Sequence, residues 1–169
     1  MAAGDVIYSS AATLTLTGLN GLASTQWWGS AAVDNSASGF LDVHVGGKIV
    51  INTTIGANGY IEVYAYGSYD GTTVTSGLNN VSLPGAITWG TNTSELGYQD
   101  LRLLGVASVG INDDGGDVVE FGAFSIAQAF GGFVPKTWGI VIKNSTGATF
   151  DATGTGNQIA YTGVKIATS

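Results

Sequence analysis

The chain has 169 residues, which fits one domain, because single domains usually run to roughly 100–200 residues. It contains no cysteine and one histidine, which excludes disulfide frameworks, thiolate metal sites and multi-histidine zinc sites. Five basic residues against twelve acidic ones give a formal net charge of −7, and this balance argues against a nucleic-acid-binding protein, whose surface would carry a basic patch.

The scarcity of charge is the most informative feature of the composition. Only 10% of the residues are charged, against about 25% in an ordinary soluble domain. There are 27 glycines but only 2 prolines and no Gly-X-Y period, so the chain resembles neither a disordered linker nor collagen. Because soluble monomers normally carry mixed surface charge, we expect this protein to use much of its surface for contacts.

The N-terminal residues 1–11 show no sustained hydropathy period and are expected to form an arm, with residues 12–169 as a single domain. The arm is either a frayed end or a segment that crosses onto a neighbouring subunit. The start of the chain lacks the basic and apolar regions of a secretory signal, and no run reaches the roughly 18 apolar residues of a membrane span. We therefore expect folding in a cytosol and no membrane partner.

Alternation of apolar and polar residues predicts strands through most of the first half, whereas helical patterning is almost absent. The expected strands are residues 13–17, 27–33, 40–45, 48–54, 60–66 and 72–75. Gly46-Gly47 predicts a two-residue hairpin between the third and fourth of these, and Asp70-Gly71 predicts a hairpin between the last two.

The second half continues the pattern with strands expected at residues 86–89, 101–111, 118–126, 138–143 and 159–166. A bend is expected in the second of them at Gly105. Residues 125–130 are either the end of a strand or a short helix, because Ala and Gln favour helix and Gly131-Gly132 would end it. Taken together, these eleven candidate ranges indicate about eight to ten strands, and their spacing predicts an all-β, antiparallel β-sandwich or a barrel, of which we favour the sandwich.

Several of these strands are apolar on both faces, although a sandwich strand with one solvent-exposed face should carry polar residues on that face. In residues 138–143, for example, Trp138, Ile140 and Ile142 alternate with Val141. The inner set would build the core, and the outer set must be covered either by loops of the same chain or by another subunit. Since the chain has so few charges, we expect another subunit.

The C-terminal third contains the segments FSIAQAFGGFVP at residues 124–135, WGIVIKNSTGA at 138–148 and YTGV at 161–164. Over roughly residues 98–166 this residue pattern resembles the C-terminal part of small virion proteins of tailed bacteriophages. The nearest group is the capsid auxiliary proteins, called cement or decoration proteins. The resemblance implies a jelly-roll-like β-sandwich that acts by binding. It would be a homotrimer on the outer capsid surface that bridges subunits of the major capsid protein, in a virion assembled in the bacterial host cytoplasm.

Six aromatic residues are candidates for subunit or capsid contacts, because large aromatics dominate interface hot spots: Trp27, Trp28, Tyr60, Tyr64, Tyr66 and Trp138. Adjacent strand residues point to opposite faces, so at most one of the two neighbouring tryptophans is expected in the core. The three tyrosines share a face with Glu62 and form either a carbohydrate-binding stripe or an ordinary half-buried strand face. The alternative function is therefore a carbohydrate-binding module, or a head or tail fibre component for surface attachment.

The polar residues give little support for catalysis or metal binding. The turn at residues 113–117 contains three aspartates, but their spacing is not that of an EF-hand, so we expect no metal. His44 is expected to be a surface or interface residue. A glycosidase would need two carboxylates across a cleft, and nothing in the sequence brings together any two of the candidates Glu62, Glu95 and Glu120. We expect no enzymatic activity and no cofactor.

Overall fold

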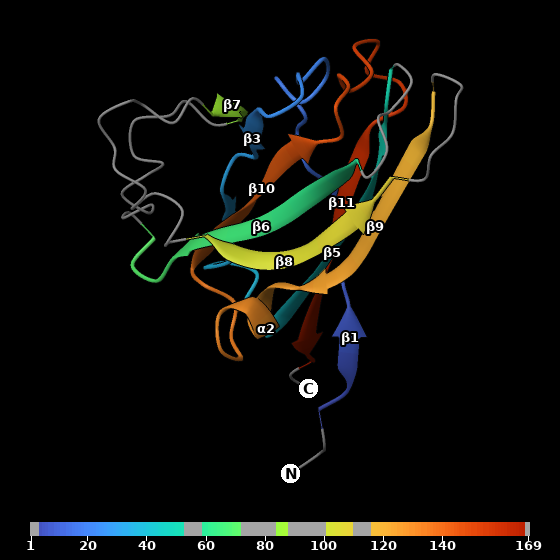
Figure 1. Ribbon diagram of the computed structural model, residues 1–169. Coiled ribbons are helices and arrows are strands. Elements are labelled where there is room, and N and C mark those ends of the chain that lie inside the picture. Colours follow the sequence, from blue (N-terminus) through green and yellow to red (C-terminus); the bar gives the residue numbers. More distant parts are fainter. Residues whose placement is uncertain (1–3, 53–58, 72–83, 88–100, 110–115, 168–169) are drawn as a thin grey trace.

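The computed structural model describes residues 4–52, 59–71, 84–87, 101–109 and 116–167. These residues form eleven strands in two sheets, with one four-residue helix (Figure 1). All the strand pairings between them are antiparallel, which confirms the predicted all-β antiparallel class. No helix in this part of the chain has the length and hydropathy needed to span a membrane.

The smaller sheet has five strands in the order β1-β11-β5-β9, and β2 also pairs with β11. Its strands are β1 (Val6–Tyr8), β2 (Ala12–Thr13), β5 (Asp42–Val50), β9 (Val118–Ser125) and β11 (Gln158–Ile166). The expected N-terminal arm thus contains β1, which pairs with the last residues of β11 and extends beyond the body of the two sheets (Figure 1).

The larger sheet has six strands in the order β7-β3-β10-β6-β8, and β4 also pairs with β10. Its strands are β3 (Trp27–Gly29), β4 (Val33–Asp34), β6 (Tyr60–Ser68), β7 (Gly85–Ile87), β8 (Arg102–Ser108) and β10 (Thr137–Ser145). The single strand expected at residues 27–33 is therefore two short strands, which pair with different parts of β10.

The predicted hairpin at Gly46-Gly47 is wrong. β5 runs straight through both glycines between β11 and β9, and its register with β9 shifts between Val45 and Gly47. A Cβ atom on Gly47 would lie 2.5 Å from the carbonyl oxygen of Gln158, so the glycine allows a close approach of neighbouring strands rather than a turn. The second predicted hairpin reaches residues 72–75, which lie outside the described residues.

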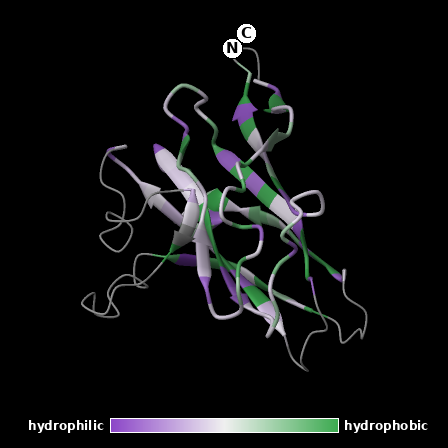
Figure 2. Cartoon of the chain, turned by 90° about the horizontal axis from the view of Figure 1, so that it is seen from above, coloured by the Kyte–Doolittle hydropathy of each residue, from purple (hydrophilic) through white to green (hydrophobic). Residues whose placement is uncertain are grey.

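The main core lies between the two sheets. In β6, Ile61, Val63 and Ala65 are fully buried there, as the alternation predicted. Trp28 from β3 is also completely buried in this core. Figure 2 shows the underlying pattern as alternating hydrophobic and hydrophilic bands along the strands near the termini.

Within residues 125–130, β9 ends at Ser125 and a short helix follows it. α2 spans Ile126–Ala129, and the Ser125 hydroxyl oxygen caps it by accepting a hydrogen bond from the Gln128 N–H at 3.0 Å. The Ser125 hydroxyl in turn donates to the Asp42 carboxylate at 2.9 Å, which ties the helix to β5. Gly131 and Gly132 follow with φ of 81° and 109°, a conformation that ends the helix.

Three strand glycines lie directly beneath aromatic rings. A Cβ atom on Gly139 would overlap the ring of Tyr66, its neighbour across the β10–β6 ladder. A Cβ atom on Gly105 would likewise overlap the ring of Phe124, and one on Gly163 would overlap the ring of Phe40. Part of the high glycine content therefore allows aromatic rings to approach the strands closely.

Candidate functional site

The outer face of the six-stranded sheet is covered by the chain itself around β3 and β10, whereas Leu103 and Val106 on the edge strand β8 remain more than half exposed. A second apolar cluster forms there from Trp27, Tyr66, Ile87, Leu101 and Val141, with Tyr64 packed against it. Val141 has no exposed surface, because segments of the same chain cover it. This corrects the expectation that another subunit covers the outer apolar set of residues 138–143.

A polar network lies beside this second cluster. The Lys143 ammonium is 2.6 Å from Oε2 of Glu62, its cross-strand neighbour, and 5.3 Å from the centre of the Trp27 ring. The Tyr64 hydroxyl donates a hydrogen bond to Oε1 of Glu62 at 3.0 Å. The rings of Tyr64 and Trp27 are 5.5 Å apart. The network thus holds the carboxylate and the ammonium against each other and against aromatic rings, so it stabilises the sheet rather than offering a reactive group.

Replacement of Lys143 by Met is expected to lower the free energy of unfolding by about 1–2 kcal/mol, because it leaves a mostly buried carboxylate without its counter-ion. Urea titration of the variant measures this loss. The double variant Lys143→Met with Glu62→Gln is the control and should lose less than the sum of the two single changes. Strict additivity would contradict a coupled pair.

Three of the six aromatic contact candidates are core residues of the single chain. Trp28, Tyr66 and Trp138 are at most 1% exposed. The Trp28 indole donates to the Thr17 carbonyl at 2.8 Å, and the Trp138 ring meets the Tyr161 ring edge-on at 5.1 Å. The Tyr66 hydroxyl donates to the Ser30 carbonyl at 2.7 Å, and burial raises the pKa of this hydroxyl far above its usual range. Their assignment to an interface is therefore corrected.

The other three candidates keep little free surface. Trp27 is 5% exposed and Tyr64 is partly buried beneath it, while Tyr60 at the start of β6 is 37% exposed. Because Tyr66 is buried and Tyr64 is engaged with Trp27, the tyrosine stripe does not form a continuous surface. The proposed carbohydrate-binding role of this stripe therefore has no platform on β6.

The structure does not bring the carboxylate candidates together. Glu62 lies on the outer face of the six-stranded sheet and Glu120 lies on the five-stranded sheet, while Glu95 is outside the described residues. Asp113 and Asp114 of the predicted acidic turn are also outside them. No group of three potential metal ligands occurs in the part of the chain that the structure describes. His44 lies at the surface as expected, 3.2 Å from Oδ2 of Asp42.

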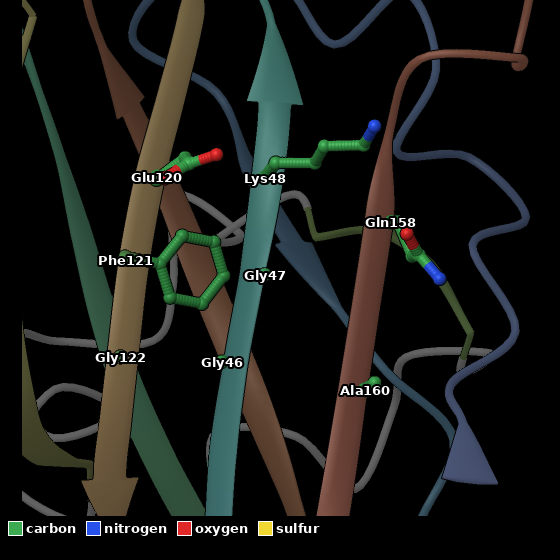
Figure 3. A pocket seen from close by; sticks show the side chains of 8 residues that line it. All are labelled: Gly46, Gly47, Lys48, Glu120, Phe121, Gly122, Gln158 and Ala160. Atoms are coloured by element: carbon green, nitrogen blue, oxygen red, sulfur yellow. The ribbon is translucent and has the colours of Figure 1, made fainter. Parts of the chain in front are cut away.

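The outer face of the five-stranded sheet differs from that of the six-stranded sheet, because no other segment that the structure describes fills the space above its centre. Two neighbouring hollows of about 450 and 440 Å³ lie on it and share Gly46 and Ala160 in their linings. Figure 3 shows the first of them, with Lys48, Glu120 and Gln158 in a row across three strands. This face, not the tyrosine stripe, is the candidate functional surface.

An apolar corner adjoins this face at its β1 edge. Val6, Ile7 and Tyr8 of β1 are 63%, 37% and 65% exposed, and Ile166, the cross-strand neighbour of Val6, is 51% exposed. No described strand pairs with the free edge of β1. We call these four residues the apolar corner. The sequence analysis missed it because it treated residues 1–11 as an arm without pattern, although three consecutive large apolar residues were visible there.

Comparisons with protein-family models, with curated proteins and with solved structures found no match. The function must therefore be inferred from the surfaces described above.

Proposed function

We propose that this protein is a structural virion component of the cement or decoration type, which binds copies of itself and the outer surface of a phage capsid and has no catalytic role. The apolar corner is the observation that carries the proposal. Four large apolar side chains lie exposed together at an open sheet edge, in a chain with only 10% charged residues. Exposed edges without charges or proline favour pairing with another chain.

The strand order supports this proposal through the fold. In chain order, β5 and β6 lie in opposite sheets, as do β9, β10 and β11 in turn. Together with the orders β2-β11-β5-β9 and β3-β10-β6-β8, this crossing favours a jelly roll. Jelly rolls occur in viral capsid domains and also in lectins, so the fold is compatible with a capsid role.

The proposed contact is an antiparallel pairing of β1 with the same strand of a second copy. Such a pairing would satisfy the free backbone groups of Val6–Tyr8 and bury the apolar corner. This contact is two-fold and joins pairs of copies, so the trimer that the phage resemblance implies would need a separate three-fold contact, and the β1 pairing would then link neighbouring trimers on the shell. Each specific interface would need to bury about 1,200–2,000 Å² in total.

Light scattering at micromolar concentration tests the proposal. The wild-type chain is expected to be oligomeric, and Val6→Asp is expected to weaken association at least about tenfold, because it places a charge in the buried contact. Val118→Asp is a matched control, since Val118 is similarly exposed at 53% but lies on β9 at the opposite edge of the sheet.

A strictly monomeric wild-type chain, or an equal effect of both substitutions, would contradict the role of the apolar corner. Cross-linking mass spectrometry on the assembly purified from the native source then identifies the neighbouring protein. Cross-links to a major capsid protein support the decoration role, and cross-links to a tail or head fibre alone would replace it with the fibre alternative.

A further inference from the structure

The open face of the five-stranded sheet is arranged in rows that run across the strands. One row contains Gln158, Lys48 and Glu120, which are cross-strand neighbours on β11, β5 and β9. Four residues earlier on β5, a second row contains Thr162 and His44. At about 3.3 Å per residue, the two rows are separated by about 13 Å.

Between these rows the strands carry glycine and alanine, apart from Phe121 and Tyr161, which also line the hollows but pack in or against the main core. The floor is formed by Gly46, Gly47, Ala160, Gly122 and Ala123, so the space above it remains empty. The two hollows meet over Gly46 and Ala160, and Tyr8 lines the far end of the second one. We call this continuous depression, bounded by the two polar rows, the trough; Figure 3 shows its floor and its first row.

The first row is available for a ligand. Lys48, Glu120 and Gln158 are all exposed, and within the described residues their side chains form no hydrogen bond or ion pair. Lys48 donates, Glu120 accepts and Gln158 does both, so the row offers hydrogen bonds in both directions with no net charge. The second row adds the Thr162 hydroxyl, which also serves both roles, and the His44 imidazole, whose Nε2 contacts Asp42 and whose Nδ1 remains for a ligand.

We propose that the trough binds a neutral oligosaccharide, laid across the strands. The opposite charges of Lys48 and Glu120 favour neither an anion nor a cation, and the net charge of −7 disfavours polyanions. The backbone groups of the floor are already paired between strands, so a peptide cannot add to the sheet there, and recognition must use side chains. Hydroxyl groups, which both donate and accept, match the two polar rows, and the exposed Tyr8 ring offers an amphipathic aromatic surface at the end.

This inference does not depend on self-association through the apolar corner, because Tyr8 is the one residue that the two share, and the two polar rows and the floor of the trough lie outside the corner. It also moves the carbohydrate-binding alternative from the tyrosines of β6 to the opposite sheet. A protein that attaches to a cell or particle surface would use such a trough to hold a glycan chain.

Isothermal titration calorimetry of the full chain tests the proposal with six neutral hexasaccharides: malto-, cello-, xylo-, manno-, laminari- and chitohexaose. Oligogalacturonate is the anionic comparison. At least one neutral sugar is expected to bind more tightly than oligogalacturonate. Ala160→Phe, which fills the floor, and Gln158→Ala, which only removes a polar group, are each expected to weaken that binding, the first by more than about tenfold and the second by about three- to tenfold.

Lys48→Ala should also weaken binding about three- to tenfold, whereas Lys165→Ala, a lysine of β11 outside the trough, should leave it unchanged. Thermal unfolding of each variant checks that the fold is retained. If Ala160→Phe does not fold, Gln158→Ala alone tests whether the sugar binds in the trough. The proposal is overturned if none of the six neutral sugars binds. Stronger binding of the anion, or neutral-sugar binding that Gln158→Ala and Ala160→Phe leave intact, would overturn it equally.

Discussion

Replacement of Gly139 by Ala is expected to lower the free energy of unfolding by about 3 kcal/mol. The new methyl group would overlap the ring of Tyr66, which is 1% exposed and has little room to move. Overpacking of a tight interior costs about 1–3 kcal/mol. Displacement of the ring would also break its hydrogen bond to the Ser30 carbonyl, which adds about 1 kcal/mol. Urea denaturation measures the loss.

The Tyr66→Ala background is the control for this prediction. Removal of the ring opens the space above Gly139, so the additional cost of Gly139→Ala should fall below about 1 kcal/mol there. The same cost in both backgrounds would show that the ring is not the reason for the glycine. Such a result would count against the glycine–aromatic pairing described for β10 and β6.

Replacement of Asn144 by Ala is expected to destabilise the protein by about 3 kcal/mol. This fully buried amide donates to the carbonyls of Leu22 and Ala148 at 2.9 and 2.8 Å, and it accepts from the N–H and hydroxyl of Thr146 at 3.0 and 2.7 Å. Alanine would leave the Thr146 N–H without this partner, and an unsatisfied buried group costs about 1–3 kcal/mol. The cavity left by the amide adds to the loss.

Two further variants separate the causes. Thr146→Val keeps the volume but removes the hydroxyl, which also accepts from the Ala148 N–H at 3.2 Å, so it should cost about 1–2 kcal/mol. For Asn144→Asp, the free energy of unfolding should fall further below that of the wild type at pH 7 than at pH 4. A carboxylate has no hydrogen to donate to Leu22 and Ala148, whereas the protonated carboxyl can donate to one of them. Equal losses at both pH values, measured against wild type, would contradict this account of the network.

Local sequence determined the elements wherever alternation was strong. Ile61, Val63 and Ala65 face the core as their period of two requires. The glycine pair at residues 46–47 misled the prediction, because local sequence cannot distinguish a glycine that turns the chain from one that admits a neighbouring strand. That distinction depends on β11 and β9, whose residues are more than 70 positions away in the sequence.

The site was less predictable than the fold. The contact candidates were chosen for aromatic size, but size favours burial as much as contact, and Trp28, Tyr66 and Trp138 are in the interior. The trough could not be predicted, since its polar row takes one residue from each of three distant strands.

The sequence by itself determined an all-β chain with little charge and many strand glycines, because strand period and composition are local properties. Only the tertiary structure decided which outward faces remain open. The outer side of β10 is covered by Ile87 and Leu101, whereas the trough and the apolar corner are not covered in this way. Coverage depends on where remote segments pack, and that follows from the pairing of the whole chain rather than from any one strand.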